Sequence, residues 1–438
     1  MKKLFIFAFA ILLVAVFTLP AAALENEFGG YWRTRFYMNK DFSGSDATGY
    51  DEAQDFSWVD TRTRLYYTAI LNDNLRFVNK FEWDGTWGNG DYGDIGADAK
   101  GTLEIKNSYA SMTAGILKAN VGVQGATIAR GFFFADDFSG AILNFQTDTF
   151  EVPLYWIRAD EGGIGKDAND GDLDYFGVAP IFNAGPVKIN PMLFWLTTQD
   201  ASKGSNLNTI DPDGINLDLN GGDIEALNAY FLGVNADATI GPANVWFTGI
   251  YETGKAEAAN SGDSDLDLNG FLVALGGSAN FGMVEAHGQV FYASGDDGND
   301  DNELNAFYVP TGGQSYYWSE IMGYGTFDQQ VSYGSPADKI SNIMAIGVGA
   351  MVSPMEKLGL GLDIWYAQLA EDKDLQGNDV DDDLGTEVDF TVNYALLEDL
   401  DLKVVAAYLF AGDGTNPQAD NEDGVNPFEL GAQLSLSF

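Results

Sequence analysis

Basic residues are distributed very unevenly in this 438-residue chain. All seven arginines lie within the first 160 residues, and two of them, Arg33 and Arg35, are separated by one residue, as are Arg62 and Arg64. Because side chains alternate along an extended strand, each pair would project from one face. Crowded guanidinium groups need counter-charges or water, and their field orients dipolar molecules. We expect a basic wall made of Arg33, Arg35, Arg62, Arg64, Arg76, Lys80 and Lys106.

Residues suited to covalent chemistry are scarce. The chain has no cysteine, which excludes disulfides and thiolate chemistry, and a single histidine, His287. A zinc site or a histidine-dependent triad is therefore hard to build. Glu285 and Gln289 share the expected strand face of His287, and no serine partner is near it in the sequence. The sequence predicts a protein that is not an enzyme, with His287 as a polar residue and with no tightly held cofactor.

One acidic run has the approximate spacing of a calcium loop. Oxygen ligands stand at alternate positions and Gly377 is the sixth residue. The last position carries an aspartate in place of the usual bidentate glutamate, and we expect no flanking helices. The alternatives are a loosely bound Ca²⁺ and a solvated acidic loop. The candidate ligands are Asp372, Asp374, Asp379, Asp381 and Asp383.

The segments that carry these residues have the period of two that is typical of strands. In the stretch 428–438 the even positions are apolar and the odd positions are polar or small, up to the terminal Phe438. We interpret this stretch as the closing strand of a membrane barrel, with Phe438 as an assembly residue. A closed barrel leaves no backbone group unpaired in hydrocarbon, and it shows lipid one face of each strand.

Short turns and long polar loops alternate along the chain. Eight turns, from 72–74 to 398–399, and nine loops, from 43–54 to 412–424, would join eighteen antiparallel strands. Sixteen is the alternative, because 151–158 and 187–195 alternate poorly. An even number places both termini and the short turns in the periplasm and the long loops outside the cell. A soluble sandwich or propeller is a further alternative, but nearly every strand has one apolar face and one face that carries charge or small residues.

The N-terminal residues predict export. Lys2 and Lys3 precede an apolar run over 4–19, and three alanines at 21–23 suit signal peptidase. We expect a cleaved signal peptide at 1–23, rather than a membrane anchor, and a single barrel domain at 24–438 in the outer membrane of a Gram-negative bacterium. A formal net charge of −43 argues against a nucleic-acid partner. The expected partners are outer-membrane lipid and lipopolysaccharide, the barrel-assembly machinery and small solutes.

The third long loop could narrow the lumen. Its residues 127–138 combine three consecutive phenylalanines with two aspartates. In one hypothesis the loop folds inward, so that a transverse field acts between the basic wall and an acidic constriction. In the other, the arginines only line the lumen and pair with Asp60, Glu82, Asp84 and Glu104. The candidate constriction residues are Arg130, Phe132, Phe133, Phe134, Asp136 and Asp137.

Five stretches, taken in order, resemble the homotrimeric outer-membrane porins of sulfate-reducing and related Gram-negative bacteria: Phe81–Gly88, Leu103–Tyr109, Val121–Gly125, Asp136–Ala141 and Tyr292–Asp297. The resemblance implies a water-filled homotrimer that passes small hydrophilic solutes by diffusion. Polar and small residues expected on the lipid-facing side of the third to fifth strands would suit a subunit contact. These residues are Asn79, Asn107, Ala119 and Gly125.

Together these features predict a porin for passive diffusion of small hydrophilic solutes and ions. The alternative from another class is a non-conducting surface or adhesion barrel that uses its long acidic and aromatic loops for recognition. The aromatic loop 296–337 contains Tyr316, Tyr317, Trp318 and Tyr324 and could equally fold over the mouth of the barrel. The sequence leaves the preferred solute and the sign of ion selectivity open.

Overall fold

The computed structural model describes residues 24–42, 54–88, 102–162, 171–200, 224–258, 264–297, 302–307, 316–328, 340–373, 379–415 and 426–438. The expected signal peptide at 1–23 lies outside the described residues. All the strands formed by these described residues belong to one sheet of 21 strands.

The first half of the sheet contains β1 (Glu25–Phe42), β2 (Gln54–Asn72), β3 (Leu75–Thr86), β4 (Thr102–Ala114), β5 (Leu117–Ile128), β6 (Phe134–Gln146), β7 (Phe150–Asp160), β8 (Leu173–Val178), β9 (Ile181–Ala184) and β10 (Val187–Thr198). The second half contains β11 (Ile224–Ile240), β12 (Ala243–Ala258), β13 (Leu266–Leu268), β14 (Phe271–Phe281), β15 (Val284–Ala293), β16 (Glu303–Leu304), β17 (Ile343–Met355), β18 (Leu358–Leu369), β19 (Asp383–Ala395), β20 (Leu400–Ala411) and β21 (Phe428–Ser437). Two short 3-10 helices are η1 (Ala129–Gly131) and η5 (Asp413–Thr415). Within the described part of the chain, no helix is long and apolar enough to cross a membrane.

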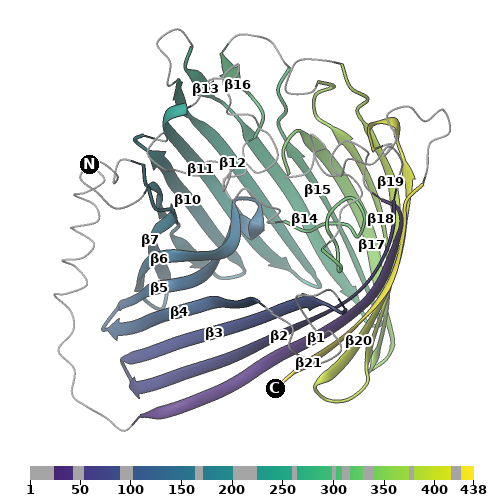
Figure 1. Ribbon diagram of the computed structural model, residues 1–438, viewed down its shortest axis with the longest axis horizontal. Coiled ribbons are helices and arrows are strands. Elements are labelled where there is room, and N and C mark those ends of the chain that lie inside the picture. Colours follow the sequence, from purple (N-terminus) through teal and green to yellow (C-terminus); the bar gives the residue numbers. More distant parts are fainter. Residues whose placement is uncertain are drawn as a thin grey trace.

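The sheet closes on itself. β1 pairs with β2 on one side and with β21 on the other, in antiparallel register from Tyr31 opposite Ser437 to Lys40 opposite Phe428 (Figure 1). β8 and β9 are two pieces of one wall strand, because both lie between β7 and β10. β13 and β16 are short extra strands that pair in parallel. The wall is therefore a closed antiparallel barrel of eighteen strands, which confirms that prediction and excludes sixteen.

The wall strand between the two segments that alternate poorly, 151–158 and 187–195, is interrupted. The wall strand made of β8 and β9 is interrupted at Ala179 and Pro180, and proline has no backbone N–H to donate to a neighbouring strand. The side chain of Asn190 in β10 compensates, because its amide donates to the carbonyl oxygens of both interrupting residues at 2.9 and 2.8 Å. The hairpin is a true part of the wall.

The short turns join consecutive strands where the sequence predicts them. Four of the hairpins contain a glycine with a left-handed backbone, which residues with a β-carbon adopt at a cost. These glycines are Gly115, Gly185, Gly241 and Gly282, with φ between 58° and 76°. The turn residues thus fix where each strand ends and, with it, the register of the wall.

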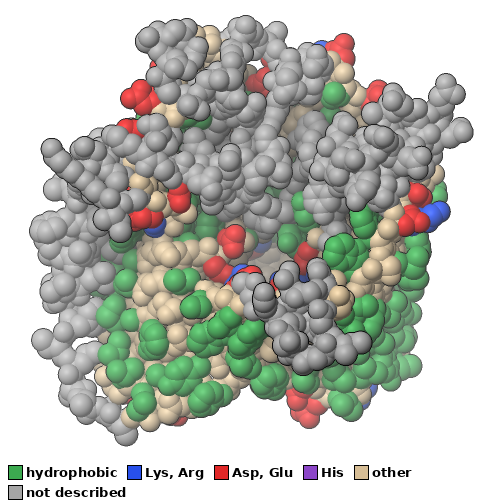
Figure 2. All heavy atoms as spheres, in the orientation of Figure 1, with side chains coloured by type: hydrophobic (Ala, Val, Ile, Leu, Met, Phe, Trp, Pro, Cys, Tyr) green, Lys and Arg blue, Asp and Glu red, His purple; other side chains and the backbone are tan. Residues whose placement is uncertain are grey.

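The outer face of the barrel is apolar. Along β18, Leu362 and Ile364 are 49% and 45% exposed, whereas Asp363 between them faces the lumen. Figure 2 shows hydrophobic side chains over much of the visible wall. This arrangement suits a wall surrounded by lipid and is the opposite of a soluble sandwich, whose apolar faces meet in a core.

Candidate functional site

The tip of the β5–β6 hairpin leaves the wall and enters the lumen. β5 pairs with β4 only up to Val123, and β6 begins to pair with β7 at Ser139. Between these points the two strands pair only with each other, up to Ile128 opposite Phe134. We call residues 124–138 the hairpin tip. It carries η1 into the interior of the barrel (Figure 1).

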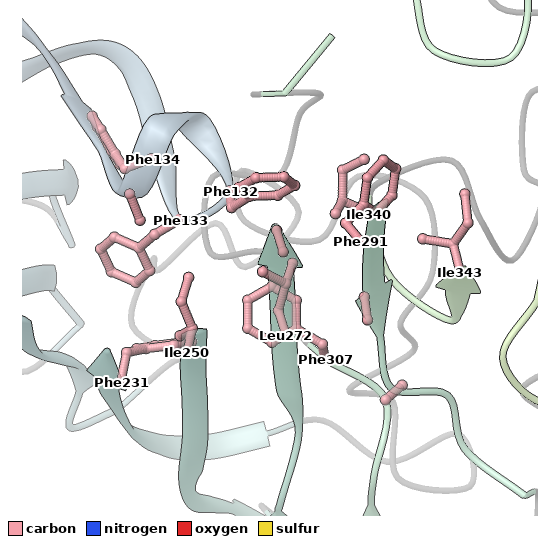
Figure 3. Packing of buried hydrophobic residues seen from close by; sticks show 14 of the residues in the cluster. Phe132, Phe133, Phe134, Phe231, Ile250, Leu272, Phe291, Phe307, Ile340 and Ile343 are labelled. Atoms are coloured by element: carbon pink, nitrogen blue, oxygen red, sulfur yellow. The ribbon is translucent and has the colours of Figure 1, made fainter. Parts of the chain in front are cut away.

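Three consecutive phenylalanines attach the hairpin tip to the far wall. Phe132 stacks on Tyr316 with ring centroids 3.7 Å apart, and Phe133 lies 4.7 Å from Phe194 of β10. Phe134 packs edge-on against Tyr175 of β8. Figure 3 shows these rings within the apolar cluster that fills this side of the lumen. The predicted inward fold of this loop is therefore present in the geometry, with the phenylalanines as its anchors.

The turn of the hairpin tip is strained and is held by contacts. Ala129 and Arg130 both have left-handed backbone conformations, with φ of 52° and 61°. Each costs on the order of 1 kcal/mol for a residue with a β-carbon. The Arg130 guanidinium is 2.5 Å from a carboxylate oxygen of Asp237 in β11 and lies 4.8 Å from the Trp246 ring centroid in β12. These contacts hold the tip in its strained conformation.

The predicted basic wall is present on β1 to β4, but its charges are compensated. Arg33 lies directly across from Arg62 in the β1–β2 register, and Arg35 forms a double hydrogen bond with Asp60. Arg62 pairs with Asp84, and Arg64 with Glu82, which is 1% exposed. The partners are the carboxylates named by the lumen-lining hypothesis. The alternating charges stabilise one another and leave little net positive charge on this wall.

The remaining residues of the predicted basic wall and of the predicted constriction have different surroundings. Lys106 pairs with Asp137 of the hairpin tip at 2.8 Å, and Glu104 lies 3.9 Å from the same amine. Lys80 lies over the Tyr66 ring, and Arg76 is exposed and forms no ion pair with a described residue. Asp136 accepts the backbone N–H of Asp137. The acidic tip therefore meets the basic wall at Lys106 rather than at an arginine.

A second segment inside the lumen, 316–328, was not predicted as a constriction. We call it the inner loop. Asp328 lies 3.1 Å from Arg33 and 2.7 Å from Arg35, and Phe327 stacks on Tyr37 of β1 at 4.8 Å. In its middle, the buried Glu387 of β19 accepts the backbone N–H groups of Ile321 and Met322 at 2.6 and 2.9 Å. The inner loop thus lies inside the lumen along the wall from β19 through β20 and β21 to β1.

The aromatic side chains of the inner loop point into the barrel. Trp318 is 8% exposed and packs against Trp365 of β18, and Tyr316 donates a hydrogen bond to Gln289 of β15 at 2.7 Å. Burial raises the pKa of the Tyr316 hydroxyl to about 12, so this donor stays protonated at physiological pH. The recognition-surface alternative expected these rings on an outer surface. Here Tyr316 joins the inner loop to the hairpin tip through its stack on Phe132, and Trp318 packs against the wall.

The inner loop covers a cavity of about 700 Å³ on the side of the lumen nearer the short turns. Strands β12 to β21 supply most of its lining, together with Arg33 of β1. Its polar and aromatic lining includes Trp246, His287, Gln289, Asp363, Trp365 and Lys403. His287 Nε2 lies 2.6 Å from Asp363 Oδ1, so the single histidine is a lumen residue as the sequence predicts.

Among the predicted calcium ligands, those that the structure describes do not line this cavity, and neither does the terminal Phe438. Asp374 lies outside the described residues, and Asp379 pairs with Lys373. Among the described residues, no group of three or more acidic or histidine side chains could hold a metal ion. The calcium site therefore stays a prediction. Phe438 exchanges two backbone hydrogen bonds with Gly30, at 2.8 and 3.1 Å, and its side chain is 65% exposed.

Two of the four residues expected to face lipid at a subunit contact do not lie there. The strand pairing shifts at Lys106, so that Asn107 lies opposite Lys80 on the lumen face. A bulge of this kind reverses the alternation beyond it. Gly125 belongs to the hairpin tip, which has left the wall. Asn79 and Ala119 lie on the outward face, and both side chains are covered by neighbours.

No protein-family model and no curated protein matches this sequence. Solved structures with a similar fold include OpdQ of Pseudomonas aeruginosa, at 11% identity and a TM-score of 0.56, covering 94% of this chain and 97% of that one. The outer membrane protein OprD of the same organism has 10% identity and a TM-score of 0.53, covering 95% of each chain. OccK2 (OpdF) of P. aeruginosa, solved in complex with glucuronate, has 11% identity and a TM-score of 0.55, covering 94% of this chain and 98% of that one. At these identities the similarity establishes that the chain shares the fold of eighteen-stranded outer-membrane channels.

Proposed function

We propose that this protein is an outer-membrane channel through which small hydrophilic solutes and ions diffuse passively. The main support for this proposal is that the interior of the barrel is polar and partly open. Two inserted segments narrow it, and a polar cavity of about 700 Å³ remains below the inner loop. A barrel that served only as a scaffold for outer loops would gain nothing from a polar, partly open interior. Larger barrels of this class enclose aqueous channels.

The paired charges of the lumen support a selective rather than a wide pore. Arg33, Arg35 and Asp328 meet between β1 and the inner loop, and Lys106 and Asp137 meet between β4 and the hairpin tip. A solute that passes these points encounters donors and acceptors at close range, which orient it. The complex of OccK2 with glucuronate concerns a small polar solute in a barrel of the same fold.

We further propose that the protein is exported to the outer membrane and assembled there. The signal peptide at 1–23 would direct export, and the barrel-assembly machinery would recognise the closing strand that ends at Phe438. Lipid and lipopolysaccharide would surround the apolar outer face. A homotrimer is the expected assembly.

The proposal can be tested by reconstituting the full chain in liposomes and measuring swelling in solutes of graded size. We expect rapid swelling with small sugars and amino acids and a steep decrease once the solute exceeds the narrowed lumen. Protein that is unfolded before reconstitution is the control. If folded protein admits no solute of any size, the channel proposal is wrong.

A further inference from the structure

The wall below the inner loop carries two neighbouring rows of lumen-facing residues across β12, β14, β15, β17, β18 and β19. The pairing registers place each row residue directly across from the next. The first row is Asn244, Ser278, His287, Gly349, Asp363 and Asp389. The second row is Trp246, Gly276, Gln289, Gly347, Trp365 and Glu387. Polar groups and indole rings thus lie side by side on one concave surface.

Glycines in these rows give the surface its shape. A β-carbon at Gly276 would overlap the Trp246 ring, and one at Gly347 would overlap the Trp365 ring. A β-carbon at Gly349 would likewise collide with the hydrogen bond that His287 and Asp363 form across it. The absence of side chains at these positions lets the indole rings and the His287–Asp363 pair lie along the wall. The floor of the cavity is therefore built by three specific glycines.

The ionic groups that line the cavity are already paired. Arg33 contacts Asp328 at 3.1 Å, and Lys403 lies 3.7 Å from Glu320. His287 contacts Asp363, and Asp389 accepts the backbone N–H of Glu320 at 3.4 Å. A charged solute would have to separate one of these pairs to find a counter-charge, which costs desolvation and Coulomb energy.

Several neutral hydrogen-bonding groups are free in the same cavity. Gln289 uses its oxygen to accept from Tyr316, while its amide hydrogens bond to no described residue. The side chains of Ser278, Thr391 and Gln433 line the cavity and form no hydrogen bond with any residue that the structure describes. These groups supply both donors and acceptors, the combination that hydroxyl groups need.

We propose that this cavity is a binding site for a neutral polyhydroxylated ring of monosaccharide or disaccharide size. The proposal rests on the channel function, since the solute reaches the cavity through the lumen. Hydroxyl groups bond to Gln289, Ser278 and the free oxygen of Asp363, and the apolar ring faces pack against the indoles of Trp246 and Trp365. A volume of about 700 Å³ lies within the range of small-molecule sites.

The test is titration calorimetry on the folded full chain in detergent with three matched rings: glucose, glucuronate and glucosamine. We expect glucose to bind at least about tenfold more tightly than either charged ring, a difference of about 1.4 kcal/mol. Gln289→Ala and Asp363→Ala should each weaken glucose binding about tenfold, the effect of one lost hydrogen bond. Glu285→Ala is the matched control, because Glu285 lies on the same face of β15 outside the cavity, and we expect it to leave glucose binding unchanged.

Two outcomes would overturn the proposal: no heat with glucose, or tighter binding of a charged ring. A single-channel recording of the same preparation separates this failure from failure of the channel function. Current steps without glucose binding would support the channel function and refute the sugar site. Glucose binding that both variants weaken, in a protein that passes no current, would support the site and contradict the channel.

Discussion

The hairpin tip and the inner loop both narrow the lumen, but different forces hold them there. The tip is fixed mainly by apolar packing, with Phe132 and Phe133 fully buried among rings from β10, β11 and β15, in addition to the ion pairs of Arg130 and Asp137. The inner loop is fixed mainly by polar contacts: the partly exposed Asp328 pairs with two arginines, and the buried Glu387 accepts from two backbone amides. Apolar contacts are insensitive to salt, whereas contacts between partly exposed ions weaken as salt screens them. The tip is therefore the permanent part of the constriction and the inner loop the adjustable part.

The largest effect should follow from removal of an apolar anchor. Phe133→Ala leaves a cavity among Phe194 and Phe231, which costs about 3–5 kcal/mol. We expect a lower unfolding temperature and a higher single-channel conductance as the tip detaches, to the same degree at low and high salt. Circular dichroism and bilayer recordings measure the two quantities. An unchanged conductance would mean that the tip does not narrow the pore.

The next effect tests the attachment of the inner loop to β19. Glu387→Ala removes the acceptor of two buried N–H groups, and each buried donor left unsatisfied costs about 1–3 kcal/mol. We expect larger and noisier current steps from an intact barrel. Thr386→Ala, on the outward face of the same strand, is the matched control and should conduct like the parent protein. Equal behaviour of the two variants would refute this role of Glu387.

A smaller effect is expected at the end of the inner loop. Asp328→Asn keeps the shape of the side chain but leaves Arg33 and Arg35 with less compensation. The reversal potential in a salt gradient should shift toward anion permeation relative to the parent protein. Asp160→Asn, on β7 rather than on the inner loop, is a control that replaces one carboxylate in the same way. A shift of the reversal potential toward cation permeation would contradict the role of Asp328 in compensating the two arginines.

The smallest effect concerns salt alone. Raising the salt from about 0.1 M to about 1 M shortens the Debye length from about 10 Å to about 3 Å. Hydrogen–deuterium exchange at Phe327 and Asp328 should become faster, because the ion pairs of Asp328 with two arginines are partly exposed. Exchange at the buried Phe132 and Phe133 of the hairpin tip should stay the same. If both segments respond equally, the distinction between an apolar and an ionic anchor is wrong.

The sequence reveals the barrel and the hairpin tip because their signals are local. A period of two, glycines in tight turns and three adjacent phenylalanines in a polar loop can all be read within a few residues. The inner loop gives no such signal, since Asp328 and its partner Arg33 are 295 residues apart. The sequence also failed to predict that Asn107 faces the lumen. The bulge at Lys106 reverses the alternation of side chains, and no residue pattern in the sequence indicates that bulge. The glycine-shaped floor also depends on register across six strands.

Single-channel recording of the full chain in a planar bilayer under a salt gradient shows whether this barrel is a channel that the hairpin tip and the inner loop narrow. We expect discrete current steps from the parent protein, larger steps from Phe133→Ala and from Glu387→Ala, and a reversal potential that Asp328→Asn moves toward anions. A folded barrel that gives no current, and still gives none after either anchor is removed, would contradict the channel function.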